Sequence, residues 1–397
     1  MSGIASKPRP RVLFLFNHDA AHQAAHVAGI MAELTANYPA FEVIAAFGTA
    51  EIASRVRQLI GEDAARGVSW ADLSLPGALD AALSAPNRIA PLKRLARLRY
   101  HMPLFATVDA VVSPERTCLM VRRVLRKKMG NSAPRFVFVP HGAGDRNVTY
   151  HPALSQFDHY LVSGQKVVDE LVRHGLATED QCRVVGYAKF DTVTRKPDAR
   201  LFANDLPTIV YNPHFDPCLS SWYDQGPALL ETAARQWDRF NLVFAPHVML
   251  FRKSLHVSLE YRTARKRPPI PRIALEAPNI HVDVDSPRLF DMTYTAAADI
   301  YLGDVSSQVY EFLREPGTCI FLDAARQGPA AYQFWQNGPV VTQAADVWPL
   351  VERWGDLAQE YRSTQERLFH YTMDIDPART ASERGADALA ELFSAPS

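Results

Sequence analysis

The sequence predicts an α/β protein of two domains, each built on a parallel sheet covered by helices. Short apolar strands alternate with helices along the whole chain, which is typical of such sheets. The chain has 397 residues, and a single core rarely grows beyond about 250–300 residues. A charged stretch without clear periodicity, residues 192–206, separates two runs of the alternation. We therefore expect domains at 1–195 and 196–397, with the last helix, 381–393, possible as a segment that folds back across them.

The first domain is expected to alternate in this way from its first strand onward. Its predicted strands are residues 11–16, 41–46, 110–113, 136–140, 160–163 and 183–186, and its first two predicted helices are 19–37 and 51–60. The second domain is expected to contain strands at 208–211, 241–245, 280–282, 300–302 and 319–322, and helices at 227–240 and 308–313. The basic, proline-rich segment 262–272 is expected to be a loop.

Composition narrows the class of protein. Lys+Arg and Asp+Glu both number 43, so the chain lacks the overall basic field that nucleic-acid binders use. Its four cysteines are scattered without a CxxC pair, which indicates free thiols in a reducing cytosol. No apolar stretch approaches the roughly 20 residues of a spanning helix. We expect a cytoplasmic protein that is soluble or peripheral to a membrane.

The stretch from residue 298 to 323 predicts a strand, a polar turn, a helix and a second strand. Ser306 or Ser307 is placed to cap the helix, whose N-terminal amide groups attract phosphate. Glu311 lies one turn further along and is placed to accept hydrogen bonds from a sugar diol. The alternative is an ordinary turn with a capping serine.

Other polar clusters also follow predicted strands, at the sheet edge where α/β proteins bind ligands. In the glycine-flanked turn after residues 136–140, His141 suits a general base and Arg146 suits a phosphate contact. The alternative for His141 is a loop histidine that satisfies backbone groups. The remaining clusters are Gly186 with Lys189 and Asp191, residues 211–216 beginning at Tyr211, Pro246 with His247, and Asp283 with Asp285.

Taken in order, these clusters resemble one family. The series His-Gly…Arg, Gly-x-x-Lys-x-Asp, Tyr-x-Pro-x-Phe, Pro-His and Asp-x-Ser-Ser is similar to that of the CDP-glycerol glycerophosphotransferases, which include the teichoic-acid polymerases and primases. The resemblance runs from about His141 to the C-terminus, where residues 380–393 resemble the family's closing Ala-Ser-x-Arg helix. Lys189, Asp216 and the order Pro246-His247 depart from the family pattern, so a related CDP-polyol is an alternative donor.

The resemblance implies a GT-B-like fold of two Rossmann-type domains whose parallel sheets face a central cleft. It implies transfer of glycerol phosphate, or a related polyol phosphate, from a CDP-linked donor to a membrane-associated glycan or lipid, with release of CMP and no cofactor or metal. His141 is the implied base, and His247 is implied to bind or stabilise the phosphates. The implied donor and phosphate ligands are Arg146, Gly186, Lys189, Asp191, Tyr211, Asp304, Ser306, Ser307 and Glu311.

Three histidines near the N-terminus share one predicted helical face. His18, His22 and His26 stand at i, i+4 and i+8. A metal site is one interpretation, but no HExxH motif or nearby cysteine accompanies them. We prefer a histidine-lined wall near the acceptor, with Asn17 and His18 facing it. A half-exposed polar stripe is the alternative.

Two predicted helices are strongly basic. Lys93, Arg94 and Arg97 belong to one, and Arg126 and Lys127 belong to the other. Docking on an anionic membrane surface, with leucines 92, 95 and 98 on the apolar side, is the interpretation that suits a lipid-linked acceptor. It places the protein on the inner face of the cell membrane. A solvated helix face is the alternative, and RNA binding is disfavoured because no aromatic platform accompanies the charge.

Two other functions remain open on the same scaffold. A sugar-nucleotide 2-epimerase, or a glycosyltransferase, also uses two Rossmann-like domains. A non-catalytic nucleotide-binding module is the third hypothesis. The motifs favour the transferase.

Overall fold

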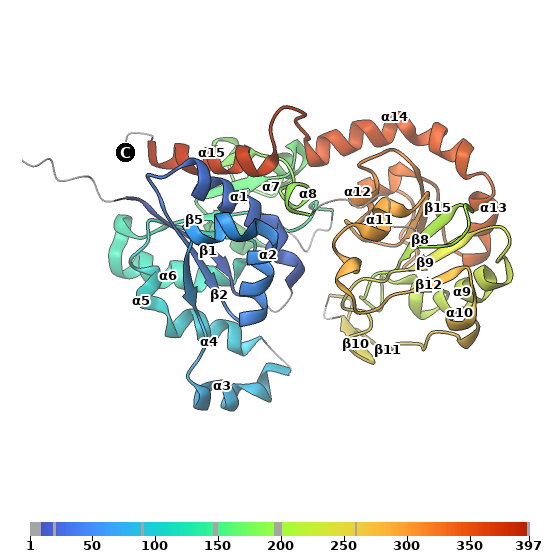
Figure 1. Cartoon of the computed structure of the whole chain (residues 1–397), viewed down its shortest axis with the longest axis horizontal. Helices are drawn as coiled ribbons and strands as arrows, with labels where there is room; N and C mark the ends of the chain where they lie inside the picture. Colours follow the sequence, from blue (N-terminus) through green and yellow to red (C-terminus); the bar gives the residue numbers. More distant parts are fainter. Residues whose placement is uncertain are drawn as a thin grey trace, which may run out of the picture. The chain divides into compact units, whose positions relative to one another are not determined.

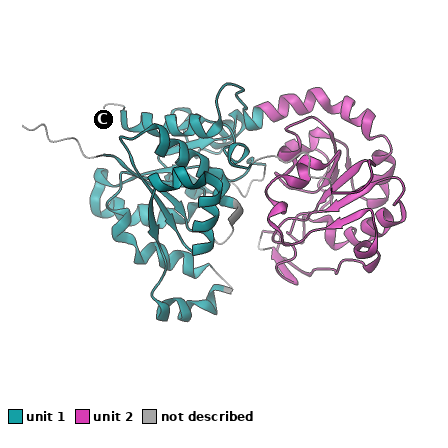
Figure 2. Cartoon of the chain, viewed as in Figure 1, with its two compact units in different colours: residues 1–193, 371–397 teal, residues 194–370 magenta. Residues whose placement is uncertain are grey.

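A computed structural model describes residues 9–18, 21–88, 91–145, 150–193, 201–258 and 260–394. The chain divides into two compact units, coloured separately in Figure 2. Unit 1 contains residues 1–193 and 371–397, and unit 2 contains residues 194–370. The C-terminal segment therefore belongs to the same unit as the N-terminus.

Unit 1 is built on a parallel sheet. Within the described residues its strands follow the order β3-β2-β1-β4-β5-β6-β7. They are β1 (Arg11–Phe16), β2 (Glu42–Phe47), β3 (Ser69–Asp72), β4 (Ala110–Ser113), β5 (Arg135–Phe138), β6 (His159–Val162) and β7 (Cys182–Val184). The central strand β1 is buried along residues 12–16, as expected for a strand that is covered on both faces.

Helices cover both faces of this sheet (Figure 1). They are α1 (Ala25–Asn37), α2 (Ala50–Gly67), α3 (Gly77–Ser84), α4 (Leu92–Tyr100), α5 (Met102–Phe105), α6 (Leu119–Met129), α7 (Gln165–Arg173) and α8 (Lys189–Thr192). Leu13 and Leu15 of β1 pack with α4 to α7, whereas Val12, Phe14 and Phe16 pack with α1 and α2. This alternation follows from the two-residue period of a strand.

Unit 2 is built on a second parallel sheet, with the strand order β12-β9-β8-β13-β14-β15 in the described part of the chain. Its strands are β8 (Thr208–Asn212), β9 (Asn241–Phe244), β12 (Ile280–Val282), β13 (Ile300–Gly303), β14 (Thr318–Leu322) and β15 (Val340–Val341). Its helices are α9 (Gly226–Arg235), α10 (Arg272–Glu276), α11 (Thr293–Ala297), α12 (Val309–Phe312) and α13 (Val347–Val351). The stretch 298–323, predicted as a strand, a polar turn, a helix and a second strand, forms β13, α12 and β14.

The prediction of a loop at 262–272 is wrong. Strand β10 (Leu255–Ser258) pairs antiparallel with β11 (Thr263–Lys266), and α10 begins at Arg272. Side chains of β10 alternate between exposed and buried, which lets a basic segment form a two-stranded hairpin. Arg265 of β11 forms an ion pair with Asp224, so part of its charge is neutralised.

The chain ends with two longer helices, α14 (Trp354–Met373) and α15 (Ala381–Ser394). Helix α15 lies against α1 within unit 1 (Figure 1). The helices meet at small residues, because a Cβ atom at Gly29 would stand 2.2 Å from Ser382 Oγ and one at Gly385 would stand 2.8 Å from Ile30. Among the described residues, no helix combines the length and apolarity needed to span a bilayer.

Asp191 holds the start of α15. Its Oδ2 atom accepts hydrogen bonds from the Ser382 amide at 2.7 Å and from Ser382 Oγ at 2.8 Å. We expect Asp191→Ala to lower the free energy of unfolding by about 1–2 kcal/mol, because first-turn amide groups lose their acceptor. Urea denaturation measures this loss, and Glu62→Ala, which removes an exposed carboxylate, is the control. Equal stability of the two variants would contradict the assignment.

Candidate functional sites

The loops after β1 and β4 of unit 1 are tied together by an arginine. Asn17 Nδ2 donates to the carbonyl oxygen of Arg94 at 2.9 Å, and Arg94 Nε donates to the carbonyl oxygen of Asn17 at 3.0 Å. Arg94 also forms an ion pair with Glu115. Asn17 and His18 are both buried, at 3% and 1% exposure. Both side chains are thus enclosed by protein, and a role for them in facing the acceptor stays a prediction.

His141 follows β5 and has a defined tautomer. Its Nδ1 atom is 2.9 Å from the carbonyl oxygen of Pro114. A carbonyl oxygen only accepts, so Nδ1 carries the proton and Nε2 of the neutral ring keeps its lone pair. The ring remains exposed to solvent. Protein atoms nevertheless surround it, and the resulting desolvation lowers its pKa, with a further lowering by the Arg94 charge against an opposing effect of the Pro114 hydrogen bond.

Two aromatic side chains extend the His141 region. The His26 ring lies 6.4 Å from the His141 ring and 5.1 Å from the Tyr187 ring, between centroids. His26, at one end of the predicted histidine stripe, therefore lies near His141. The His22 side chain and all of Arg146 lie outside the described residues. Among those that are described, no group of three or more His, Cys, Asp or Glu side chains is arranged to hold a metal.

The Gly186–Asp191 segment has a structural role in unit 1. Gly186 has a φ of +91°, and a Cβ there would stand 3.0 Å from Ala381 Cβ. Lys189 is buried, and Asp191 holds α15 as described above. Gly186 and Asp191 therefore help to attach the C-terminal segment, and their donor contacts stay a prediction.

Two histidines follow neighbouring strands of unit 2. His214 comes after β8 and His247 after β9, and their ring centroids are 5.3 Å apart. The amide of Asp216 donates to His214 Nδ1 at 3.0 Å, and the amide of Met249 donates to His247 Nδ1 at 3.2 Å. Because Nδ1 accepts in both, Nε2 carries the proton of each neutral ring. These two rings therefore have the tautomer opposite to that of His141.

His214 was not among the predicted site residues, although the sequence carries a signal for it. The dipeptide Pro-His occurs twice directly after a strand of unit 2, at Pro213-His214 and at Pro246-His247. The amide of His247 donates to the carbonyl oxygen of Pro213 at 3.0 Å. Parallel neighbouring strands bring their carboxyl ends to one edge, so a repeated dipeptide at those ends predicts a pair.

Asp304 and Tyr211 are buried structural residues. Asp304 Oδ2 accepts the amides of His214 at 2.9 Å and Ser221 at 3.0 Å. Tyr211 is fully buried, and its hydroxyl is 2.7 Å from Ser221 Oγ. Neither side chain reaches solvent. Their contacts fix the loop that carries His214, in place of the predicted direct contact with a donor.

Burial raises the pKa of Asp304 from 3.8 to about 7. The folded protein therefore binds a proton more tightly than the unfolded chain, and stability falls as the pH rises from about 4 to about 7. We expect Asp304→Asn to flatten this dependence, because the amide is neutral and its oxygen still accepts both N–H groups. Urea denaturation at several pH values between 4 and 8 measures the effect. An unchanged slope in the variant would contradict it.

The turn after β13 lies beside a small recess. Ser306 Oγ accepts the amide of Gln308 at 3.3 Å, and Ser307 is half-buried. The recess measures about 230 Å³, including space open to solvent, and is lined by polar and apolar residues from several parts of unit 2. They include Asn212, Arg288, Gln308 and the buried Glu311. Glu311 borders this recess, and its role as a ribose ligand stays a prediction. Arg288 was missed because nothing in its sequence context distinguishes it.

Part of the charge of the basic helix α4 is used within unit 1, and membrane docking stays a prediction. Arg97 of α4 is only 7% exposed, Arg94 pairs with Glu115, and Lys93 pairs with Asp80. Leu98 is fully buried in the core, although Leu92 and Leu95 are exposed.

Helix α6 also uses much of its charge internally. Arg122 and Arg126 both pair with Asp158. Lys127 and Lys128 stay exposed. Helical spacing alone did not show which cations face the protein.

The two parallel sheets, with helices on their faces and polar loops at the carboxyl ends of their strands, define a GT-B-like α/β fold. Solved structures with this fold include the wall teichoic acid polymerase TagF, here a histidine-to-asparagine variant soaked with CDPG. It is 12% identical, the alignment covers 98% of this chain and 90% of that chain, and the TM-score is 0.60.

The UDP-GlcNAc 2-epimerase from Neisseria meningitidis, bound to UDP-GlcNAc, is similar to the same extent. It is 12% identical over 97% of this chain and 100% of that chain, with a TM-score of 0.64. Another UDP-N-acetylglucosamine 2-epimerase is 12% identical, covering 98% and 96% of the two chains, with a TM-score of 0.60. No protein-family model matches the sequence, and neither does any curated sequence. At these identities the likeness defines the fold alone.

Proposed function

We propose that the protein is a transferase that moves glycerol phosphate, or a related polyol phosphate, from a CDP-linked donor to a glycan or lipid acceptor. An acceptor hydroxyl oxygen forms a bond to the β-phosphorus of the donor, and the bond from that phosphorus to the CMP oxygen breaks. The hydroxyl proton passes to a base, and CMP leaves. No cofactor or metal is part of this proposal.

The opposite tautomers of the histidines are the observation that carries the proposal. Phosphoryl transfer needs a proton acceptor for the attacking hydroxyl and hydrogen-bond donors for the phosphate oxygens. In unit 1, the Pro114 carbonyl leaves Nε2 of His141 as the proton acceptor. In unit 2, backbone amides leave Nε2 of His214 and His247 as N–H donors. Each chemical role thus has a ring in the required form.

Surrounding groups support the same roles. Desolvation and the Arg94 charge lower the pKa of His141, which favours the neutral ring that can accept a proton. Arg288 supplies positive charge beside the unit 2 recess, and the Glu311 carboxylate there suits the hydroxyl groups of a ribose. The TagF likeness adds support, since that structure was soaked with CDPG.

Cytoplasmic location is part of the proposal, and membrane docking through α4 is not. The cysteines are all free thiols, which suits a reducing compartment. Arg94 of α4 pairs within unit 1 and Arg97 is buried there, whereas Arg99 is exposed. Peripheral membrane binding would use exposed cations such as the lysines of α6, and sedimentation with anionic liposomes tests it.

A sugar-nucleotide 2-epimerase is the second candidate, favoured by the TM-score of 0.64 to an enzyme bound to UDP-GlcNAc. One experiment separates the two. The protein is incubated with CDP-glycerol and a bacterial lipid extract, and separately with UDP-GlcNAc. The proposal predicts CMP release that depends on the extract. Epimerised UDP-sugar without CMP release would overturn it, and stabilisation by CDP without any turnover would favour a nucleotide-binding module.

A further inference from the structure

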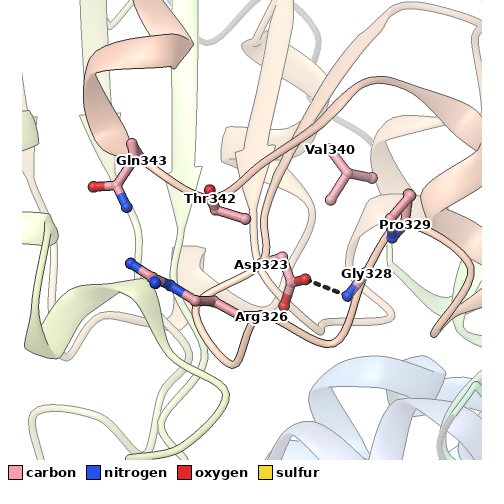
Figure 3. Close-up of a pocket in the computed structure, with 7 residues that line it drawn as sticks. All are labelled: Asp323, Arg326, Gly328, Pro329, Val340, Thr342 and Gln343. Atoms are coloured by element: carbon pink, nitrogen blue, oxygen red, sulfur yellow. Dashed lines mark hydrogen bonds between the residues drawn. The ribbon is translucent and has the colours of Figure 1, made fainter.

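A second recess in unit 2 shares no residue with the one beside Glu311. It is formed by the loops after β14 and β15 and encloses about 550 Å³, including space open to solvent. Its lining residues are Asp323, Arg326, Gly328, Pro329, Val340, Thr342 and Gln343 (Figure 3). None of them was singled out for chemistry by the sequence.

The lower wall of this recess is held by a buried carboxylate. Asp323 is 1% exposed, and its two oxygens accept the amides of Gln327 at 3.0 Å and Gly328 at 2.7 Å. The loop it closes carries Arg326 with a φ of +53°, a conformation that arginine rarely adopts. This fixes the backbone at Arg326, and its side chain is exposed to solvent.

The opposite wall is held by a glutamine. Gln225 Nε2 donates to the carbonyl oxygen of Thr342 at 3.1 Å, and its Oε1 accepts the amide of Ala344. The amide of Asp323 donates to the carbonyl oxygen of Val341 at 2.9 Å, so the two walls are also joined. Both walls are thus fixed before any ligand arrives, which lowers the entropy lost on binding.

The polar groups of the recess are complementary to a polyol phosphate. In Figure 3 the Arg326 guanidinium and the Gln343 carboxamide lie on the same side, toward one another. Arg326 makes no ion pair or hydrogen bond through its side chain with any residue that the structure describes, so its fork is available for a phosphate. The Thr342 hydroxyl and the Gln343 carboxamide are suited to hydroxyl groups.

We propose that this recess binds a polyol phosphate, while the nucleotide donor binds elsewhere. The end of an acceptor chain would supply such a polyol phosphate. The choice of glycerol phosphate rests on the proposed function. Strands of a sheet are about 4.8 Å apart, so a site between β14 and β15 lies roughly 12 Å from the end of β8, where His214 stands. The two sites therefore share one edge of unit 2 and are far enough apart for two ligands.

Titration calorimetry with sn-glycerol 3-phosphate tests this inference on the full chain in the presence of saturating CDP. Wild type is expected to bind, Arg326→Gln to bind about 10-fold more weakly or worse, and Arg326→Lys to fall between them. Arg362→Gln, which removes an exposed arginine of α14, is the matched control and is expected to bind as wild type does. Glycerol and inorganic phosphate, which each offer half of the ligand, are expected to bind more weakly than glycerol phosphate.

Three outcomes would overturn the inference. They are no binding by the wild type, equal binding by Arg326→Gln and wild type, and competition between glycerol phosphate and CDP. Because the assay needs no turnover, it is independent of the proposed reaction. If Arg326→Gln loses binding of glycerol phosphate while the wild type releases no CMP from CDP-glycerol, the binding site is supported and the transferase function is rejected.

Discussion

Replacing His141 with asparagine is expected to lower the rate of CMP release from CDP-glycerol by about 100- to 10,000-fold. The asparagine amide nitrogen occupies the position of Nδ1 and still donates to the Pro114 carbonyl, which is 2.9 Å from Nδ1 in the wild type. No atom replaces the lone pair of Nε2, so the acceptor hydroxyl loses its base. Single-turnover CMP release, measured with saturating donor, shows the effect on the chemical step.

His101→Gln is the control for this variant. His101 lies in unit 1, and its Nε2 atom is 2.9 Å from the Ser74 carbonyl, a contact that a glutamine amide reproduces. Both variants are expected to unfold at the wild-type urea concentration. CMP release by His141→Asn at more than a tenth of the wild-type rate would contradict the role of His141.

Replacing His247 is expected to give the second large loss of CMP release. The size of this loss depends on which residue replaces the histidine. A glutamine places its amide nitrogen close to the position of Nε2 and retains a donor, whereas an asparagine reproduces Nδ1 and loses it. Removal of one positioned donor to a developing phosphate charge lowers kcat by about 100- to 1,000-fold. We therefore expect a loss of this size for His247→Asn and a much smaller loss for His247→Gln.

Steady-state CMP release measures both variants, and CDP affinity shows whether the loss lies in binding or in the chemical step. Equal rates for the two variants would contradict the assignment of Nε2 as the donor. The backbone contact of the ring is a hydrogen bond from Met249 to Nδ1 at 3.2 Å. Unchanged urea denaturation of both variants excludes a loss of fold as the cause.

The sequence predicted the architecture well because strand burial is local information. Residues 300–302 and 319–322, predicted as strands, lie in β13 (Ile300–Gly303) and β14 (Thr318–Leu322). The hairpin at β10 and β11 was missed because its strands are short and β11 is basic, and only their pairing makes them regular. A pattern that depends on a partner strand is not visible in the residues themselves.

The roles of side chains were harder to predict, because they depend on partners far away in sequence. Asp191 was interpreted as a donor ligand, but its hydrogen-bond partner Ser382 is 191 residues away. Tyr211 stands in a polar motif, yet its side chain points into the core of unit 2. Charge density in α4 indicated a surface, but Arg97 is buried.

The tautomers of the histidines also could not be predicted from the sequence. His141 and His247 both follow strands and have similar sequence contexts, and nothing in the residues distinguishes a proton acceptor from a proton donor. The difference comes from one backbone group each. A carbonyl at Pro114, 27 residues from His141, and an amide at Met249, two residues from His247, fix opposite forms.

The most direct test is nitrogen-15 NMR of the histidine rings in the wild-type protein at neutral pH, with His141→Asn and His247→Asn used to assign the signals. The account predicts that Nε2 of His141 is the unprotonated nitrogen and that Nδ1 of His247 is the unprotonated nitrogen. The same tautomer for both rings, or a His141 ring that is charged at neutral pH, would contradict it.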